Sequence, residues 1–347
     1  MQYFALVYMK KLQNTIKDIA LELKLSPSTV SRALNDHPHI SQETKQKVRE
    51  TVEKLGYRHN AIAASLRNNK SNIVGLIVPR ISMFFQSTVV TAIQNKLHEH
   101  GYNLMICQSN DSPALEKELV NVLYASRVEG LIVASTLYTT DFSPFDIFSN
   151  NNIPLVFYDR LPKNYPAHKI QGDEYQGGYQ ATRHLIEQGC RRIAHIGGPL
   201  TCNLYQDRFQ GYQDALRKSG IEPDEEIIFF HELTKENALN DCNEMWQKGN
   251  FPDGIFACND TTAITIVEFA RKHNIAIPDK LKLSGYTNDP RTQIIEPPIT
   301  SVEQFPYQVG EEAARLMLNL IQHKVEPDKN YVSITTPIEL IKRRSSS

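Results

Sequence analysis

Two short helix-forming segments separated by a tight turn lie near the N-terminus of this chain, in the sequence TIKDIALELKLSPSTVSRALN at residues 15–35. Thr15 and Ser26 are residue types that cap helix N-termini well. Pro27 suits a first helical position, where its missing N–H sacrifices no hydrogen bond. Apolar residues recur at helical spacing in both segments. The pattern predicts two helices packed across a turn, an arrangement that many proteins use to read DNA.

The second of these predicted helices has a polar face as well as an apolar one. Val30, Ala33 and Leu34 are placed to pack on the first helix. A third helix is predicted from its N-cap Ser41 to Gly56, which closes it. An ordinary pair of surface helices is the alternative, since helix pairs with short turns are common. The polar face that could enter a major groove consists of Ser28, Thr29, Ser31, Arg32 and Asn35.

Positive charge is concentrated at the same end of the chain. Residues 10–70 contain twelve Lys and Arg and six Asp and Glu, a net charge of +6, whereas the whole chain carries −1. Residues 71–347 therefore carry −7, because residues 1–9 have no charged side chain. Phosphates attract a basic head and repel an acidic body. Combined with the helix pattern, this distribution favours nucleic-acid binding over a merely solvated charged face.

Residues 15–67 resemble the DNA-binding head and hinge of the lactose-repressor (LacI/GalR) family of bacterial transcription regulators. The resemblance rests on DIA at residues 18–20, STVSRALN at 28–35 and LGY at 55–57. It implies a helix-turn-helix domain over residues 10–58, with a recognition helix at 27–35. A hinge helix or linker over 59–70 would fold in the minor groove beside that of a second subunit. The implied contacts to double-stranded DNA are Thr15, Ser26, Pro27, Ser28, Thr29, Ser31, Arg32, Asn35, His39, Ser41, Thr44, Asn60, Ala63 and Leu66.

Leu66 has a special role in this resemblance, as a wedge inserted between central base pairs to kink the duplex. The residues alone favour a plain packing role for Leu66, so the wedge assignment rests on the resemblance.

From residue 73 onward, short apolar runs alternate with amphipathic helical patterns. This alternation predicts an α/β fold with parallel sheets covered on both faces. The runs are too many for one comfortable sheet, so we expect two lobes with a ligand cleft beyond the strand carboxyl ends. Strands are predicted at 73–78, 102–107, 130–134, 153–158, 192–196, 226–230, 254–258 and 282–285, and helices at 88–100, 114–127, 176–188, 209–219, 236–248 and 262–273.

The body resembles the same family, whose effector domain is similar to periplasmic sugar-binding proteins. The resemblance implies a two-lobed effector-binding and dimerisation domain over residues 71–347. One lobe would comprise about 71–169 and 300–329, and the other about 170–298 and 331–347. We expect the lobes to close on a ligand by hinge motion at the crossing segments.

Polar and aromatic residues at the predicted strand ends are candidates for effector binding. Arg208 stands where the family has its main ligand arginine, in the pattern R-x-x-G-[WYF], and its guanidinium would orient a ligand. As alternatives, Asp260 is equally well explained as a helix N-cap, and Asp159 with Arg160 as a local ion pair. The candidates are Phe84, Phe85, Asp159, Arg160, Arg208, Asn259, Asp260, Thr287 and Gln304.

One departure from the family pattern bears on the ligand. Members that bind sugars or purines often have Gly-Tyr-Asp, whereas this chain has Gly-Tyr-Thr-Asn at residues 285–288. Thr287 thus replaces the usual carboxylate, and Asn288 is expected to substitute in part. With Arg208 and Arg160 present, the cleft is expected to favour a neutral or anionic ligand, such as a sugar acid or sugar phosphate.

No pattern for catalysis, cofactor binding or metal binding is present. The sequence lacks G-x-x-x-x-G-K, G-x-G-x-x-G, H-E-x-x-H and G-x-S-x-G. Five widely spaced cysteines argue against a disulfide framework or a zinc site and favour a reducing cytoplasm. No apolar run reaches 18 residues, so no membrane span is expected. An enzyme body or a ligand receptor without specific operator binding remains the rival interpretation.

The sequence as a whole predicts a cytoplasmic homodimeric regulator, a repressor, that binds a pseudopalindromic operator and responds to a small carbohydrate or carbohydrate derivative. Inducer and corepressor both fit, as do dimer and tetramer. Met9-Lys10-Lys11 resembles a natural start, so residues 1–8 are expected to be an extension; they make a poor signal peptide.

Overall fold

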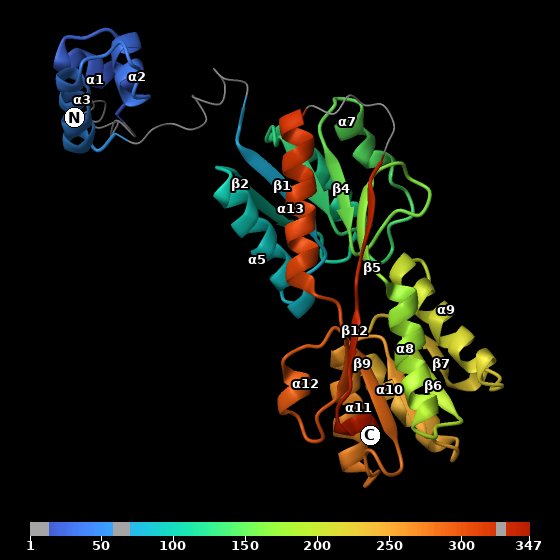
Figure 1. Ribbon diagram of the computed structural model, residues 1–347. Helices are drawn as coiled ribbons and strands as arrows, with labels where there is room; N and C mark the ends of the chain where they lie inside the picture. Colours follow the sequence, from blue (N-terminus) through green and yellow to red (C-terminus); the bar gives the residue numbers. More distant parts are fainter. Residues whose placement is uncertain (1–13, 58–69, 324–330) are drawn as a thin grey trace, which may run out of the picture. The chain divides into compact units, whose positions relative to one another are not determined.

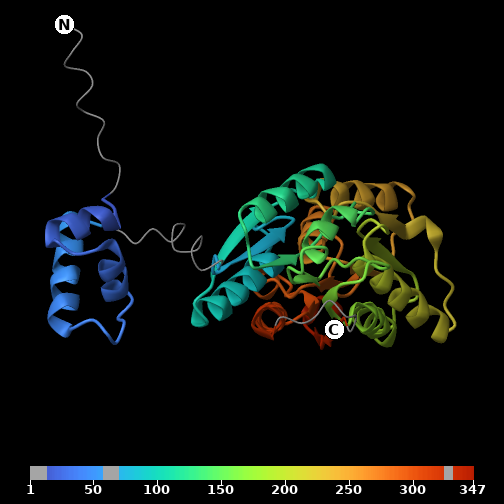
Figure 2. The ribbon, with the colours of Figure 1, turned by 90° about the horizontal axis from the view of Figure 1, so that it is seen from above.

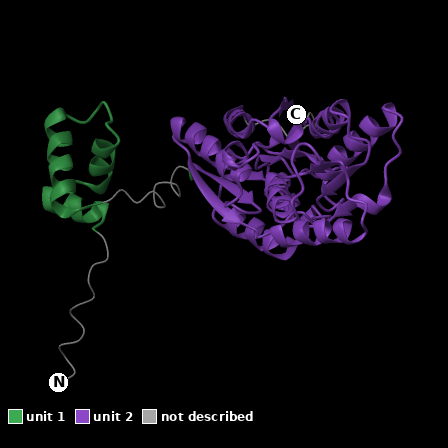
Figure 3. Ribbon diagram, turned by 90° about the horizontal axis from the view of Figure 1, so that it is seen from below, with its two compact units in different colours: residues 1–71 green, residues 72–347 purple. Residues whose placement is uncertain are grey.

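The computed structural model describes residues 14–57, 70–323 and 331–347. The chain divides into two compact units, residues 1–71 and residues 72–347 (Figure 3). The first contains helices, and the second is built on two six-stranded sheets. The predicted α/β class with a helical head is confirmed.

Three helices make up the described part of the first unit: α1 (Ile16–Leu23), α2 (Pro27–Leu34) and α3 (Gln42–Leu55). Each begins at the N-cap that its sequence predicts, and α3 ends at Gly56 in the left-handed conformation, with φ of 59°. One small core joins the three helices. Its buried members are Ile19, Ala20, Val30, Ala33, Val48 and Tyr57.

Sheet A of the second unit is parallel throughout, with the strand order β11-β5-β4-β3-β1-β2. Alternate residues of β1 enter different cores, because neighbouring side chains of a strand point to opposite faces. Helices α5 and α13 cover one face, and α6 covers the other (Figures 1 and 2). The elements are β1 (Ile73–Val78), α5 (Phe84–Glu99), β2 (Asn103–Gln108), α6 (Pro113–Ala125), β3 (Gly130–Val133), α7 (Asp146–Ser149), β4 (Leu155–Tyr158), β5 (His168–Gly172), α13 (Pro306–His323) and β11 (Ser333–Thr336).

Sheet B has the order β12-β10-β9-β8-β6-β7, and its strands are parallel except for β12, which runs antiparallel to β10. Helices α8 and α9 pack on one face, and α10 and α11 on the other. The elements are α8 (Glu174–Glu187), β6 (Ile193–Gly197), α9 (Asn203–Lys218), β7 (Ile228–Phe230), α10 (Lys235–Gln247), β8 (Gly254–Ala257), α11 (Asp260–Lys272), β9 (Lys282–Tyr286), α12 (Arg291–Ile294), β10 (Thr300–Glu303) and β12 (Glu339–Ile341).

The chain crosses between the two sheets three times: between β5 and α8, between β10 and α13, and between β11 and β12 (Figure 1). We call residues 72–172, 305–323 and 331–336 the sheet A lobe, and residues 173–304 and 337–347 the sheet B lobe. At two crossings the backbones are joined, because the Asp173 N–H donates to the Thr336 carbonyl at 3.1 Å.

The sheets correct the lobe boundaries expected from the sequence. Residues 170–172 complete β5 in sheet A, residues 300–303 form β10 in sheet B, and residues 333–336 form β11 in sheet A. Two of these strands, SITT and TSVE, are short and polar, so no apolar run marks them. Helices α5 and α9 also begin four to six residues before their predicted starts.

Several other properties of the described residues bear on function. None of the helices there is long and apolar enough to cross a membrane. All five cysteines are unpaired, and four of them are buried. Within residues 14–57, 70–323 and 331–347, no cluster of three His, Cys, Asp or Glu side chains could hold a metal ion.

Candidate nucleic-acid interface and effector site

The N-terminus of α2 is fixed by a cluster of three hydroxyl groups. Ser26 Oγ accepts a hydrogen bond from the Thr29 N–H at 3.1 Å, which is the predicted N-cap interaction. The same oxygen lies 2.7 Å from Ser28 Oγ and 2.8 Å from Thr29 Oγ1. Pro27 occupies the first helical position. These small groups therefore present a compact polar helix end to solvent.

Arg32 is the positively charged residue on the polar face of α2. Its side chain is exposed, and it makes no ion pair or hydrogen bond with the part of the chain that the structure describes. Ser28 and Asn35, which lie one turn before and one turn after Arg32, are exposed as well. Asn35 Nδ2 donates to the Ser31 carbonyl at 2.9 Å, which holds the end of the helix. A guanidinium without a protein partner is suited to the acceptors of a guanine edge or a phosphate.

The other predicted DNA contacts in the head lie at helix starts and in the turn before α3. Thr15 donates its N–H and its hydroxyl to the Asp18 carboxylate, both at 2.8 Å. Ser41 Oγ caps α3 by accepting from the Thr44 N–H at 3.2 Å. His39 is exposed and its N–H donates to His37 Nδ1 at 3.3 Å. Exposed helix N-termini carry unpaired N–H groups that attract phosphates.

An ion pair between a buried lysine and an exposed aspartate joins α3 to the turn that follows α2. Lys45 Nζ lies 2.9 Å from Asp36 Oδ1, and the Lys45 side chain is only 6 % exposed. Asp36 has a positive φ of 54°, so this pair holds the turn in a conformation that few residues adopt. Asn60, Ala63 and Leu66, with the rest of the predicted hinge up to residue 69, lie outside the described residues.

In the second unit, Arg208 is buried and paired with Glu174, a residue that the sequence reasoning missed. Arg208 Nε donates to Glu174 Oε2 at 2.7 Å, and Nη1 donates to the Cys258 carbonyl at 2.8 Å. The Tyr286 ring lies against the guanidinium, 3.5 Å from ring centroid to Cζ. Nη2 has no hydrogen-bond partner within the described residues. Arg208 can therefore still donate to a ligand from this nitrogen.

Close packing of α8 on α9 brings this pair together. A Cβ added to Gly178 would lie 2.2 Å from the Arg208 carbonyl oxygen, and one added to Gly211 would lie 2.2 Å from the Tyr175 carbonyl oxygen. Both glycines thus let the helix backbones touch. Gly211 is the glycine of the R-x-x-G-[WYF] pattern, which explains physically why this pattern positions an arginine.

The Glu174 carboxylate also binds residues on β9 and after β10. It accepts from Tyr286 Oη at 2.8 Å and from Gln304 Nε2 at 3.0 Å. Gln304 in turn accepts from Thr287 Oγ1 at 3.2 Å. Glu174 and Gln304 both lie at crossings between the lobes. One carboxylate therefore connects the candidate ligand arginine to two hinge segments.

Thr287 adopts a strained backbone conformation, with φ of 107°, which is unusual for a β-branched residue. Strain of this kind is typical of ligand and switch sites. Asn288, expected to replace the family carboxylate, is engaged at both ends of its amide. Its Nδ2 donates to Glu303 at 2.7 Å, and its Oδ1 accepts from Arg343 at 2.6 Å. Asn288 is therefore a structural residue in this conformation.

Asp159 and Arg160 do not form the local ion pair weighed as an alternative. Asp159 accepts from Gln86 Nε2 at 2.9 Å, and burial raises the pKa of its carboxyl group to about 6. Arg160 pairs with the buried Asp111 carboxylate. Arg208 and Arg160 thus each have a buried carboxylate partner.

The candidates at the start of α11 have structural partners. Asn259, rather than Asp260, is the N-cap, and its Oδ1 accepts from the Thr262 N–H at 2.8 Å. Asp260 accepts from Ser301 Oγ and from the Asp289 N–H, both at 2.7 Å. Burial raises the pKa of the Asp260 carboxyl to about 7. The N-cap alternative for Asp260 was therefore wrong by one residue.

The two candidate phenylalanines open α5. Phe84 is partly exposed, whereas Phe85 is buried in the core beneath sheet A with Val78 and Val89. The structure therefore brings together Arg208, Thr287 and Gln304. Phe85, Asn259 and Asp260 instead contact other residues: Phe85 packs in the core of sheet A, Asn259 caps α11, and Asp260 accepts from Ser301 and Asp289. Glu174 had one sequence signal, its place in the first turn of α8 after the N-cap Asp173.

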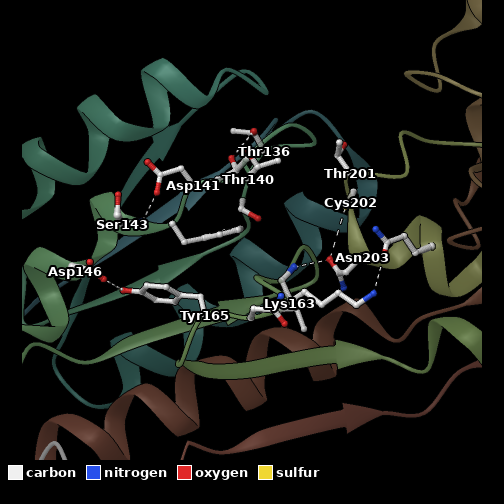
Figure 4. A pocket seen from close by; sticks show the side chains of 16 residues that line it. Thr136, Thr140, Asp141, Ser143, Asp146, Lys163, Tyr165, Thr201, Cys202 and Asn203 are labelled. Carbon is white, nitrogen blue, oxygen red and sulfur yellow. Dashed lines mark hydrogen bonds between the residues drawn. The ribbon is translucent and has the colours of Figure 1, made fainter.

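A cavity of about 450 Å³ lies between the lobes (Figure 4). Its walls come from the loops that follow β3 and β4 in the sheet A lobe and from the start of α9 in the sheet B lobe. At least four hydrogen bonds join the two lobes near the cavity. Leu161 N–H donates to Asn203 Oδ1 at 2.7 Å, and Tyr138 Oη donates to Glu232 at 3.0 Å. None of the predicted effector residues lines the cavity.

Comparisons with known proteins agree with this architecture. Residues 15–60 match the family described as bacterial regulatory proteins, lacI family, and residues 182–346 match the periplasmic binding protein-like domain. The ribose operon repressor of Halalkalibacterium halodurans is 30 % identical over 89 % of this chain and 91 % of its own. The transcriptional repressor PurR of Mannheimia succiniciproducens is 29 % identical over 95 % of this chain and 98 % of its own.

A solved structure gives the same result for the fold. A complex of the transcriptional regulator CelR with cellobiose has a TM-score of 0.72 and 26 % identity, and the match covers 96 % of this chain and all of that one. A helix-turn-helix head joined to a two-lobed α/β body defines a class of DNA-binding transcription regulators. The chain belongs to the LacI family of bacterial regulatory proteins. It is a regulator and not an enzyme, in line with its repressor relatives.

Proposed function

We propose that this protein is a cytoplasmic repressor that binds a two-fold symmetric operator as a homodimer. Its operator affinity would be set by a small neutral carbohydrate, or a derivative of one, bound beside Arg208. The observation that carries the proposal is the Glu174 carboxylate, which contacts Arg208 and Gln304 at once. A ligand that contacts Arg208 therefore acts, through one side chain, on a segment that joins the lobes.

The operator contacts follow from the head. Arg32, with no protein partner, and its exposed neighbours Ser28 and Asn35 would meet base edges in the major groove. The exposed helix starts at Thr15 and Ser41 would meet phosphates. One head covers few base pairs, so two heads related by a two-fold axis would read a palindrome with much greater specificity.

The charge of the cleft favours a neutral ligand. Glu174 compensates Arg208, and Asp111 compensates Arg160, with every one of these side chains 5 % exposed or less. A sugar hydroxyl could accept from Arg208 Nη2 without bringing a new buried charge, whereas a carboxylate or phosphate would meet the negative field of Glu174. The name of the ribose operon repressor and the cellobiose in the CelR structure support a carbohydrate.

Control would operate by linkage between the two sites. If one arrangement of the lobes binds both ligand and operator better, the ligand is a corepressor; if the two prefer different arrangements, it is an inducer. In either case ligand and operator change each other's affinity by the same factor. The size of this factor measures the coupling free energy directly.

A fluorescence anisotropy titration tests the proposal. The full-length protein is titrated onto operator DNA at near-physiological salt, without ligand and with ribose, cellobiose, gluconate or glucose 6-phosphate. A neutral sugar is expected to change the operator Kd at least fivefold. Arg208→Lys should keep the ligand-free operator Kd and lose the response. A response confined to gluconate or glucose 6-phosphate, or no response to any of the four, would contradict the proposal.

A further inference from the structure

Two neighbouring turns at one end of sheet B hold residues in the left-handed backbone region. Thr287 and Asn288, directly after β9, have φ of 107° and 53°, and Phe305, two residues after β10, has φ of 49°. Strands β9 and β10 are parallel neighbours, so the two turns leave the same end of the sheet. Positive φ is unfavourable for a β-branched or bulky residue, and the following Pro306 restricts Phe305 further. Each turn therefore needs a contact that holds it.

One carboxylate holds both turns. Glu303, the last residue of β10, accepts from the Phe305 N–H through Oε1 and from Asn288 Nδ2 through Oε2, both at 2.7 Å. Glu303 is half-buried. Hydrogen bonds to an ionised carboxylate are stronger than those between neutral groups. A glutamine amide has only one acceptor oxygen, so it could serve one of these turns but not both.

The other end of the Asn288 amide is held by the segment that follows β12. Arg343, two residues after β12, donates to Asn288 Oδ1 at 2.6 Å and to the Ile299 carbonyl at 2.7 Å. The Arg343 N–H donates to Thr300 Oγ1 at 2.8 Å, which fixes the segment against β10. Asn288 is thus fixed between Glu303, beside the crossing that leads to α13, and Arg343, in the segment that returns from β11.

The backbone conformation of Phe305 sets the direction in which the chain leaves β10. Glu303 belongs to sheet B, whereas α13 begins at Pro306 and packs with α5 in the core of the sheet A lobe (Figure 1). Domain hinges are a few such residues, which absorb large changes of φ and ψ. A return of Phe305 to negative φ would therefore turn α13, and the sheet A lobe with it, relative to sheet B.

We propose that Glu303 is a positioning residue of the hinge, which holds Phe305 in the left-handed conformation and thereby selects the arrangement of the lobes described above. Its bond to Asn288 connects this selection to Thr287, whose hydroxyl donates to Gln304 at 3.2 Å. A movement of Thr287 would thus reach Phe305 through Asn288 and Glu303. The inference goes beyond the proposed function, because it requires neither a ligand nor an operator.

The Leu161 amide measures the arrangement of the lobes. Its N–H donates from the sheet A lobe to Asn203 Oδ1 of the sheet B lobe at 2.7 Å, so this arrangement protects it from exchange with solvent. The Asp159 N–H is an internal reference, because it donates to the Ile170 carbonyl at 3.0 Å within the sheet A lobe. Neither amide is hydrogen-bonded to Glu303.

Hydrogen exchange at single-residue resolution on the full-length protein tests the proposal. In Glu303→Ala, the Phe305 and Leu161 amides should exchange at least tenfold faster than in wild type, and the Asp159 amide should stay within twofold. Glu303→Gln should give a smaller increase at Leu161. Glu339→Ala is the matched control and should change none of the three rates. Glu339 lies opposite Glu303 on β12, is exposed, and makes no side-chain hydrogen bond or ion pair with the described residues.

A second change, at Phe305, separates backbone strain from packing. Gly adopts positive φ readily, whereas Ala removes the same ring and keeps the unfavourable conformation. Glu303→Ala combined with Phe305→Gly should return the Leu161 rate to within threefold of wild type, and Glu303→Ala combined with Phe305→Ala should not.

An unchanged Leu161 rate in Glu303→Ala, or equal Leu161 rates in the two double variants, would overturn the proposal. Faster exchange of Asp159 together with Leu161, in both Glu303→Ala and Glu303→Gln, would also overturn it, because Glu303 would then support the folding of the lobe rather than the setting of the hinge.

Discussion

The carboxylate of Glu174 accepts a hydrogen bond from Arg208 at 2.7 Å, and both side chains are almost completely buried. The pair joins α8 to α9 at the point where their backbones touch. Through its second oxygen, Glu174 also accepts from Gln304 at a crossing between the lobes. The same residue thus cancels the charge of the proposed effector site and connects that site to the hinge.

Glu174→Gln should change the ligand class of the cleft. Gln is nearly isosteric with Glu but leaves the Arg208 guanidinium without a compensating charge, so an anionic ligand becomes the best partner for it. We expect the affinity for gluconate or glucose 6-phosphate to rise at least tenfold in calorimetric titration. Glu187→Gln, which removes an exposed partner of Arg183, is the control and should change nothing. An unaltered preference for neutral sugars in Glu174→Gln would contradict the charge argument.

Local signals made the head and the alternation of strands and helices predictable. Caps such as Ser26 and Ser41, and apolar residues at a fixed period, act over a few neighbours in the sequence. The Glu174–Arg208 pair was not predictable, since it joins residues 34 positions apart and depends on how α8 packs on α9. The N-cap interpretation of Asp260 failed for another reason. Asn259, the preceding residue, is an equally good capping type, and it is the residue with extended backbone that caps α11.

Arg32→Ala should weaken binding to the selected operator by about 1–3 kcal/mol and relax the base preference at one position of each half-site. The reason is that Arg32 is exposed and has no partner in the described part of the chain. Lys17→Ala is the comparison, and should weaken all sequences alike if Lys17 contacts a phosphate. Anisotropy titrations on the operator and on point-substituted operators measure both effects. Equal losses on every sequence for Arg32→Ala would show that it contacts a phosphate rather than a base.

Ser41→Ala should loosen the start of α3. Ser41 Oγ accepts from the Thr44 N–H at 3.2 Å, and loss of such a cap typically costs about 1 kcal/mol. Hydrogen exchange followed by mass spectrometry on the full-length protein should show the α3 amides exchanging about fivefold faster. Gln42→Ala, an exposed change in the same turn, is the control. Protection of α3 that is unchanged by Ser41→Ala would mean that core packing alone holds the helix.

Glu116 predicts a specific dependence of stability on pH. Burial raises the pKa of its carboxyl from 4.5 to about 7 in the folded protein. Between these values the folded state binds the proton more tightly than the unfolded state, so the free energy of unfolding falls as pH rises. The contribution from Glu116 is present in full below pH 4.5, and about 3 kcal/mol is lost by the time the pH exceeds 7.

Urea unfolding of wild type and Glu116→Gln at several pH values between 4.5 and 8 measures this effect. The stability of wild type relative to the variant should decrease steadily across the interval, because Gln does not titrate. A constant difference between the two proteins would show that Glu116 is ionised in the folded state throughout.

The most direct test of the account is the selection of genomic DNA fragments from the source organism by the purified full-length protein. The selection is made at near-physiological salt, where nonspecific phosphate binding is suppressed, with and without the neutral sugars named above. The account predicts enrichment of a two-fold symmetric site, a sugar-dependent yield, and loss of the site in Arg32→Ala. Salt-sensitive binding without sequence preference, with or without sugar, would contradict it.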